Sequence, residues 1–312
     1  MSYENIGLIG FGNWVKSAYI PFVNNFKNPK IKYVSTKTEK SLENAKKIFG
    51  NDAKYFLNYK ELLKNKEIDL IILSVPDEIH EDLLLEILSY DVDCIFEMPL
   101  TANKLNSEYI IQRIKDQENL IIPNLEMSYL PIVNYLSSII GGNKFGKLLG
   151  AKLKLSANWW PGFSVYSSSP WYIDVLNKIF KATPVKVRSN VEKKIKFPTE
   201  SKGVTILDYE KFLAEWEFNM ESTDGLSVVL DLFFENKNMN INLMNSEIIS
   251  ENNKKIDFFE PYYGWPGMHE FLEKVFFGKN VKKKKYIEDI ESLQKISNAL
   301  ELSMRTNQWV NL

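Results

Sequence analysis

Residues 6–15 read Ile-Gly-Leu-Ile-Gly-Phe-Gly-Asn-Trp-Val, a short apolar strand that runs into a glycine turn and then into a helical pattern. Gly10 allows a tight turn out of the strand, and Gly12 lets the backbone approach a pyrophosphate lying over a helix N-terminus. Val15 takes the place of the third small residue in the usual G-x-G-x-x-G/A pattern. Because an ordinary strand-to-helix turn can carry the same glycine pair, the rest of the chain must decide between a nucleotide site and a simple turn.

Strands and helices alternate from this turn to about residue 122. The apolar run Leu70–Val75 is bounded by Asp69 and Pro76, and such a run is typical of a strand buried on both faces of a parallel sheet. Further strands are expected at 31–35, 93–96 and 120–122, and helices at 19–26, 39–49, 59–63, 78–88 and 105–114. This alternation predicts an α/β Rossmann-type doubly wound parallel sheet, with ligands at the carboxyl ends of its strands.

The rhythm changes beyond Pro123. Long strands without intervening helices are expected at 148–158, 185–195, 212–219, 226–235 and 239–249, followed by helices at 268–277 and 287–304. This pattern predicts an α+β domain with an open, mostly antiparallel sheet. We therefore expect a dinucleotide-binding domain over 1–122 and a domain for substrate binding and oligomerisation over 123–312.

Composition excludes several classes of function. The chain has 312 residues, with 39 Lys and Arg against 40 Asp and Glu, so no overall charge points to nucleic acid or to an anionic membrane. The basic run at 282–285 is interpreted as a solvated loop. No run approaches the roughly 18 apolar residues of a membrane span, and the N-terminus has no leader pattern. We therefore expect a cytoplasmic protein.

The scarcity of cysteine and histidine narrows the chemistry further. Cys94 is the single cysteine, so a disulfide framework cannot form, and its apolar surroundings favour a buried, inert thiol. The two histidines, His80 and His269, are too few for a multi-histidine metal centre. No metal site is expected, and His269 is interpreted as a packing residue.

Four short segments, 10–14 (Gly-Phe-Gly-Asn-Trp), 75–80 (Val-Pro-Asp-Glu-Ile-His), 97–100 (Glu-Met-Pro-Leu) and 145–148 (Phe-Gly-Lys-Leu), occur in this order on the predicted framework. Together they resemble the Gfo/Idh/MocA oxidoreductase family. The resemblance implies a dinucleotide domain followed by an open-faced sheet domain, with NAD or NADP as the hydride carrier. It also implies a small-molecule substrate and a homodimer or homotetramer paired through the second-domain sheet.

The polar catalytic positions that the resemblance implies are altered in this chain. Where the family usually has Glu-Lys-Pro, the lysine position holds Met98, and a thioether can neither carry charge nor donate a proton. The positions of the family's aspartate and histidine hold Ser167 and Trp171. The following aspartate is kept as Asp174, which could fix a helix start instead of transferring a proton.

Other groups nearby could supply the missing proton transfer. A carboxylate or phenol can do so when its surroundings shift its pKa, and each could equally well pack or line a pocket. His80 is interpreted as a structural or cofactor-side residue. The candidate catalytic residues are Glu126, Tyr129, Tyr172 and Asp174, with Tyr166 beside them.

The end of the second strand bears on the choice of cofactor. The segment 34–37 reads Val-Ser-Thr-Lys and lacks the acidic residue that would accept the ribose hydroxyls of NAD. Thr36 and Lys37 offer a hydroxyl and a cation, which favours NADP, although Glu39 could serve NAD if the loop is longer. The residues expected to bind the cofactor are Gly10, Phe11, Gly12, Asn13, Trp14, Thr36, Lys37, Val75, Pro76, His80 and Glu97.

Two aromatic segments, 158–163 and 261–266, suit either sugar faces and planar ligands or a subunit interface. Three functions therefore compete. The first is an oxidoreductase that prefers NADP and acts on a small sugar-like, cyclic polyol or imine substrate. The second is a nucleotide-binding pseudoenzyme or regulatory subunit that has lost redox activity, and the third is a redox-neutral enzyme with a tightly held cofactor.

Overall fold

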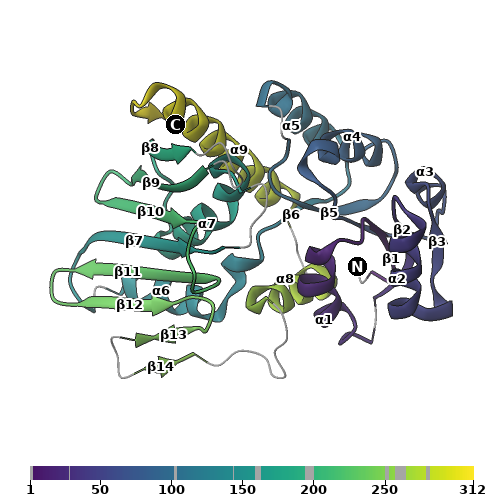
Figure 1. Cartoon of the computed structure of the whole chain (residues 1–312), viewed down its shortest axis with the longest axis horizontal. Helices are drawn as coiled ribbons and strands as arrows, with labels where there is room; N and C mark the ends of the chain where they lie inside the picture. Colours follow the sequence, from purple (N-terminus) through teal and green to yellow (C-terminus); the bar gives the residue numbers. More distant parts are fainter. Residues whose placement is uncertain are drawn as a thin grey trace. The chain divides into compact units, whose positions relative to one another are not determined.

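The computed structural model describes residues 3–27, 29–101, 104–142, 144–158, 163–193, 200–249, 253–256, 265–278 and 282–312. The backbone divides into two compact units, labelled by element in Figure 1. The first unit comprises Met1–Glu126 and Tyr263–Ser292, and the second comprises Met127–Tyr262 and Leu293–Leu312. The first division lies close to the boundary expected near Pro123. The expected division into 1–122 and 123–312 did not assign the segment Tyr263–Ser292 to the first unit, where it belongs.

A six-stranded parallel sheet forms the centre of the first unit. Its order is β3-β2-β1-β4-β5-β6, the arrangement of a dinucleotide-binding Rossmann fold. All four residues of β4 are fully buried, as expected for a strand with helices on both faces. The α/β prediction is therefore confirmed. The strands are β1 (Asn5–Ile9), β2 (Lys30–Ser35), β3 (Lys54–Phe56), β4 (Leu70–Leu73), β5 (Asp93–Glu97) and β6 (Ile121–Asn124).

The helices between these strands follow local signals in the sequence. The Thr38 side chain caps α2 by accepting a hydrogen bond from the Ser41 N–H. The Asn58 side chain caps α3 by accepting from the Lys60 N–H. The helices of the first unit are α2 (Glu39–Phe49), α3 (Tyr59–Leu63), α4 (Asp77–Ile87), α5 (Ser107–Asp116), α8 (Pro266–Phe277) and the start of α9 (Lys283–Thr306).

The helix that follows the glycine turn is not a regular α-helix. Residues Val15–Tyr19 form a π-helical turn, η1, which continues into the short helix α1 (Ile20–Val23). The N–H of Ile20 donates to the carbonyl of Val15, the five-residue step of a π-helix. Val15 is fully buried at the position where a small residue would let the helix approach the sheet closely. The widened turn thus begins at the residue that departs from the glycine-rich pattern.

A nine-stranded sheet dominates the described part of the second unit. Its order is β14-β13-β12-β11-β7-β10-β9-β8-β15, and only the central pair β7 and β10 is parallel. The mostly antiparallel prediction is confirmed, although β9 was not expected. The strands are β7 (Leu148–Ser156), β8 (Lys186–Lys193), β9 (Glu200–Asp208), β10 (Leu213–Asn219), β11 (Ser227–Phe234), β12 (Asn238–Asn242), β13 (Glu247–Ile248), β14 (Lys254–Lys255) and β15 (Val310–Asn311).

Two helices of the second unit contradict the expectation of strands without intervening helices. They are α6 (Pro131–Gly141) and α7 (Val165–Phe180), preceded by the 3₁₀ turn η4 (Glu126–Tyr129). Helix α6 opens with a proline at a position that favours a helix start, whereas α7 carries weak helix signals because it contains a serine run and Pro170. Tertiary packing outweighs these signals, because most of α7 is buried and its Tyr172 ring stacks on Trp216 of β10 at 5.5 Å.

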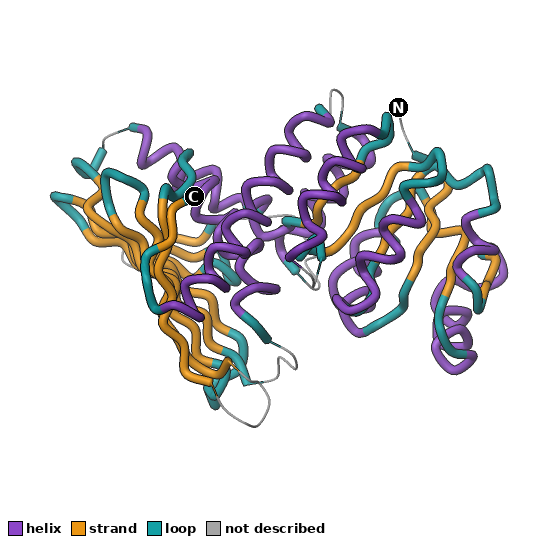
Figure 2. The backbone as a smooth tube through the Cα atoms, turned by 90° about the horizontal axis from the view of Figure 1, so that it is seen from above, coloured by secondary structure: helices purple, strands orange, loops and turns teal. Residues whose placement is uncertain are grey.

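The two faces of this sheet differ in their surroundings. Figure 2 shows helices gathered against one face, and the side chains that point there are buried, such as Leu153 and Leu155 of β7. On the other face the half-exposed side chains form ion pairs across strands, including Lys152 with Glu217 at 2.5 Å. No helix in the described ranges is long and apolar enough to cross a membrane.

Candidate functional site

The turn after β1 is shaped by two glycines with different surroundings. Gly10 has a φ of 97° and donates its N–H to the Ser35 carbonyl at 3.0 Å. A β-carbon on Gly10 would lie 1.9 Å from the carbonyl oxygen of Ser74. Gly12 is exposed, and a β-carbon there would meet no atom within 4 Å. Gly10 therefore lets the turn fit against β4, whereas Gly12 leaves open space above the backbone.

This open space fits the pyrophosphate of a dinucleotide. The turn lies at the carboxyl end of β1, next to β4, where the order of the sheet reverses and ligands of such folds bind. Asn13 is exposed beside Gly12, and Trp14 is half-buried with its ring 5.1 Å from that of Trp265. Phe11 is buried against Phe49, so its backbone and not its ring borders the space.

Of the two cofactor-binding residues predicted at the end of β2, Thr36 is buried and Lys37 is exposed. Thr36 is buried and donates its hydroxyl to the Thr38 carbonyl at 3.0 Å. Lys37 is exposed, and Glu39 is exposed in the first turn of α2. Lys37 is thus the exposed cation at this strand end, while the Thr36 hydroxyl already bonds to the loop.

The end of β4 leads through Val75 and the exposed Pro76 into α4. His80 of this helix is 1% exposed, and its Nδ1 lies 3.1 Å from the Pro99 carbonyl. Because a carbonyl only accepts, Nδ1 carries the hydrogen. Burial lowers the pKa of His80 to about 4. The structure therefore places His80 as a neutral side chain that ties α4 to the segment after β5.

Three elements of the first unit meet at Glu97, the last residue of β5. Its Oε1 accepts from the Trp14 Nε1 at 2.8 Å and from the Tyr19 hydroxyl at 2.6 Å. The amide nitrogen of Asn124 lies 3.0 Å and 3.2 Å from the two oxygens. The carboxylate is 7% exposed. The expected contact of Glu97 with the cofactor stays a prediction, and both of its oxygens accept from side chains of the protein.

Burial dominates the electrostatics of this cluster. It raises the pKa of Glu97 to about 7, against the lowering effect of the bonds from Tyr19, Asn124 and Trp14. The pKa of Tyr19 is raised well above its usual value by burial first and then by the charge of Glu97, with Glu126 adding to the effect. Glu97 is therefore the group of this cluster that can change its charge near neutral pH.

Two further predicted site residues follow the ends of β5 and β6. Met98 is 1% exposed, so the usual lysine position carries a buried thioether. Glu126 is 2% exposed and lies just beyond β6, near enough to Tyr19 to affect its pKa. Tyr129 is half-buried at the end of η4, in the second unit.

The remaining catalytic candidates lie on α7 in the second unit. Ser167 and Trp171 are half-buried. Tyr172 is 2% exposed and stacks on Trp216. Asp174 is 3% exposed, accepts a short hydrogen bond from the Ser128 hydroxyl, and lies 4.0 Å from the Lys178 ammonium. Tyr172 and Asp174 are thus engaged by the core of the second unit.

Other features noted in the sequence do not join the site. His269 packs between Phe22 and Phe26, as expected of a packing residue. It could form a small ligand group with Glu270 and Glu273 of the same helix. The aromatic residues at 159–162 and 261–264 lie outside the described residues.

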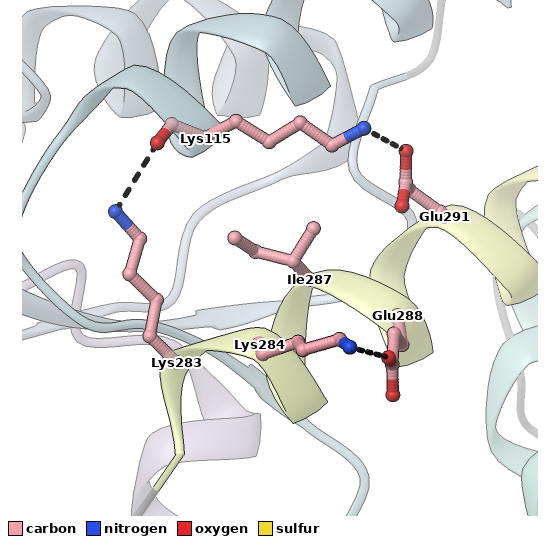
Figure 3. A pocket seen from close by; sticks show the side chains of 6 residues that line it. All are labelled: Lys115, Lys283, Lys284, Ile287, Glu288 and Glu291. Atoms are coloured by element: carbon pink, nitrogen blue, oxygen red, sulfur yellow. Dashed lines mark hydrogen bonds and ion pairs between the residues drawn. The ribbon is translucent and has the colours of Figure 1, made fainter.

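The basic run borders a shallow cavity of 470 Å³ at the start of α9 (Figure 3). Its lysines are engaged by acidic groups or a carbonyl. Lys115 bonds to Glu291 at 2.5 Å, Lys284 lies 3.8 Å from Glu288, and Lys283 donates to the Lys115 carbonyl. Lys283, Lys284 and Lys285 belong to the first turn of α9 and not to the expected loop, and the surface around them is charge-balanced.

Sequence reasoning missed two members of the Glu97 cluster, Tyr19 and Asn124. Tyr19 lies among apolar residues at helical spacing, which favours core packing. Asn124 ends the run Ile121–Asn124, and a polar side chain at the carboxyl end of a buried strand was the one available signal.

The fold and the glycine turn define the class of the first unit, a Rossmann-type dinucleotide-binding domain. Residues 4–125 match the model of the oxidoreductase family GFO_IDH_MocA, NAD-binding Rossmann fold. An uncharacterized oxidoreductase of Synechocystis sp. is 24% identical over 39% of this chain and 32% of its own length. Inositol 2-dehydrogenase of Salmonella typhimurium is 22% identical over 59% of this chain and 54% of its own length. The matched regions thus span from a third to about half of these relatives.

Solved structures agree with the fold over nearly the whole chain. GenD2 from gentamicin A biosynthesis, in complex with NAD, superposes with a TM-score of 0.82 at 12% identity, covering 100% of this chain and 97% of that protein. A myo-inositol 2-dehydrogenase from Lactobacillus plantarum has a TM-score of 0.78 at 17% identity and covers 99% of both chains. At these identities the likeness shows the fold.

Proposed function

We propose that the protein is an NAD(P)-dependent oxidoreductase that prefers NADP. The open space over Gly12, in a turn that Gly10 fits against Ser74, is the observation that carries this proposal. The cofactor, when bound, supplies or accepts a hydride. The chain itself contributes the glycine turn for the pyrophosphate and the β2 end for the adenosine ribose.

The preference for NADP rests on the side chains at the end of β2. Lys37 is exposed there, and the strand end holds no acidic residue that would repel a 2′-phosphate. Glu39 lies on the first turn of α2 and is the residue that would favour NAD. Lys37 is therefore assigned the role of selecting NADP.

For proton transfer we favour Glu126 and Tyr129 over the two candidates on α7. Glu126 is a buried carboxylate beyond the carboxyl end of β6, the edge at which such sheets bind their ligands. Tyr172 and Asp174 are already held by Trp216 and Ser128. Loss of a general acid or base commonly lowers a rate about 10²- to 10⁴-fold, and Glu126→Gln should fall in this range.

A small sugar-like, cyclic polyol or imine is the proposed substrate class. It is supported by the activities of similar proteins, the inositol 2-dehydrogenases above all. Met98 cannot donate a proton as a lysine would. The proposed substrate class therefore includes an imine, whose reduction demands less proton transfer from that position.

We also propose that two copies pair through the sheet of the second unit. On its outer face Lys152 pairs with Glu217 and Lys154 with Asp231 at 2.7 Å, so these charges are balanced within one chain. Val204 and Ile206 lie on the same face, opposite Glu217 and Glu215 of β10. A charge-balanced face with apolar residues suits a second copy. Ile206→Glu should shift the mass measured by light scattering toward the monomer.

A pseudoenzyme is the second candidate function. It is favoured by Met98, Ser167 and Trp171, which replace the three polar catalytic groups usual in the family. Calorimetric titration with NADPH and NADH, followed by turnover assays on sugars, polyols and imines, separates the two functions. Binding with turnover supports the enzyme, binding without turnover supports the pseudoenzyme, and no binding refutes both.

A further inference from the structure

Two side chains of the helix after the glycine turn bond to one atom. The Trp14 indole N–H and the Tyr19 hydroxyl both donate to Glu97 Oε1, at 2.8 Å and 2.6 Å. Trp14 comes two residues after Gly12, the glycine with open space above it. Glu97 therefore connects the end of β5 to the helix whose N-terminus borders the proposed pyrophosphate site.

This double contact depends on the π-helical turn. Five residues along a regular α-helix of 3.6 residues per turn rotate a side chain by about 140° away from the first. The step from Ile20 back to the Val15 carbonyl shows that the turn here holds an extra residue. The wider turn brings Trp14 and Tyr19, five positions apart, toward the same side of the helix.

We propose that Glu97 is a positioning residue for the dinucleotide, which fixes the helix after Gly12 through Trp14 and Tyr19. The inference rests on the proposed function, because it assumes that the turn binds a dinucleotide. The carboxylate does not need to touch the cofactor. It holds the backbone N–H groups that follow Gly12 in the orientation that an anion at a helix N-terminus requires.

The charge of Glu97 should matter for this role. Hydrogen bonds to an ionised acceptor are roughly twice as strong as those to a neutral one. The ionisable groups that face the cluster are Tyr19 itself, Asp77 at the start of α4, Glu126 beyond β6 and Cys94 on β5. Burial raises the pKa of Glu97 to about 7, so this carboxylate changes its charge near neutral pH, whereas the pKa of Tyr19 is raised well above its usual value.

The test compares cofactor affinities of three variants by calorimetric titration with NADH and NADPH. Tyr19→Phe and Glu97→Gln should each weaken binding about tenfold. Tyr3→Phe is the matched control, because the Tyr3 hydroxyl donates to Asp93 Oδ2 at 2.5 Å at the opposite end of the same strand. Its affinity should equal that of the wild type.

The pH dependence separates positioning from simple structural support. Wild-type affinity for NADH should rise between about pH 6 and about pH 8 as Glu97 ionises, while Glu97→Gln should stay flat at the lower level. An affinity that falls with pH would mean that the charge repels the cofactor directly, and would overturn the proposal.

The outcomes also separate this inference from the proposed function. A wild-type protein that binds neither dinucleotide refutes the proposed function. A wild type that binds, with Tyr19→Phe and Glu97→Gln indistinguishable from Tyr3→Phe, refutes the positioning role alone.

Discussion

The carbonyl oxygen of Ser74 lies 1.9 Å from the point that a β-carbon on Gly10 would occupy. Gly10→Ala should therefore disturb the first unit itself, at a cost of about 3 kcal/mol or more in unfolding free energy, since the φ of 97° adds strain. Gly12→Ala should unfold like the wild type yet lose most of its dinucleotide affinity. Thermal unfolding and calorimetric titration of the two variants check both results. Equal destabilisation by the two would contradict the division of roles.

Lys37 provides the test of cofactor choice. Lys37→Glu should weaken NADPH binding at least about tenfold while leaving NADH binding unchanged or improved, because a carboxylate repels the 2′-phosphate and accepts from ribose hydroxyls. Lys47→Glu makes the same charge change in the last turn of α2 and serves as the control. A loss of NADPH affinity equal in the two variants would indicate only long-range charge.

Glu97 should make the protein less stable as the pH rises. Its pKa is raised from 4.5 to about 7 in the folded protein, so the folded state holds the proton more tightly than the unfolded state. The contribution of Glu97 to the free energy of unfolding is full below about pH 4.5 and is lost as the pH rises through about 7. The total loss is up to about 3 kcal/mol.

Glu97→Gln removes this dependence, because a glutamine resembles the protonated acid and does not titrate. The cofactor-free variant should melt above the wild type at about pH 8 and near it at about pH 5. Melting curves across this range give the measurement. Greater stability together with weaker cofactor binding would be hard to explain by structural support alone, and parallel pH curves would contradict the assignment of the raised pKa.

Asp174 is predicted to act through stability. Asp174→Ala removes the acceptor of the buried Ser128 hydroxyl and should cost about 1–3 kcal/mol, whereas Asp174→Asn can still accept and should cost less. Denaturant unfolding measures the difference. If Asp174→Asn instead kept its stability and lost all turnover, the residue would be catalytic.

The fold of the first unit could be predicted because its strands are apolar runs and its helices carry recognisable starts. Leu70–Leu73 is buried on both faces, and Thr38 caps α2. The second unit was harder. Helix α7 contains Pro170 and a serine run, so local propensity argues against a helix that is stabilised by burial of Ile173 and Leu176.

The site shows the same limit. Gly10 and Gly12 were found because a backbone requirement restricts the residue type. The partnership of Glu97 with Tyr19 could not be found, since 78 positions separate the two residues and only the folded sheet brings them together. Burial decides the pKa of Glu97, and burial is a property of the three-dimensional structure.

The hydrogen bond from the Ile20 N–H to the Val15 carbonyl also determines the direction in which the later side chains of this helix point. Deleting the exposed Ser17 would let the backbone return to ordinary α-helical spacing with Trp14 and Tyr19 four positions apart, a separation that leaves the two side chains within about 40° of each other. The π-turn thus absorbs one extra residue while keeping Trp14 and Tyr19 on the same side of the helix. Substitutions at the exposed Lys16 or Ser17 should therefore be tolerated, and removal of one of these residues should convert the π-turn to an α-helix without separating Trp14 from Tyr19.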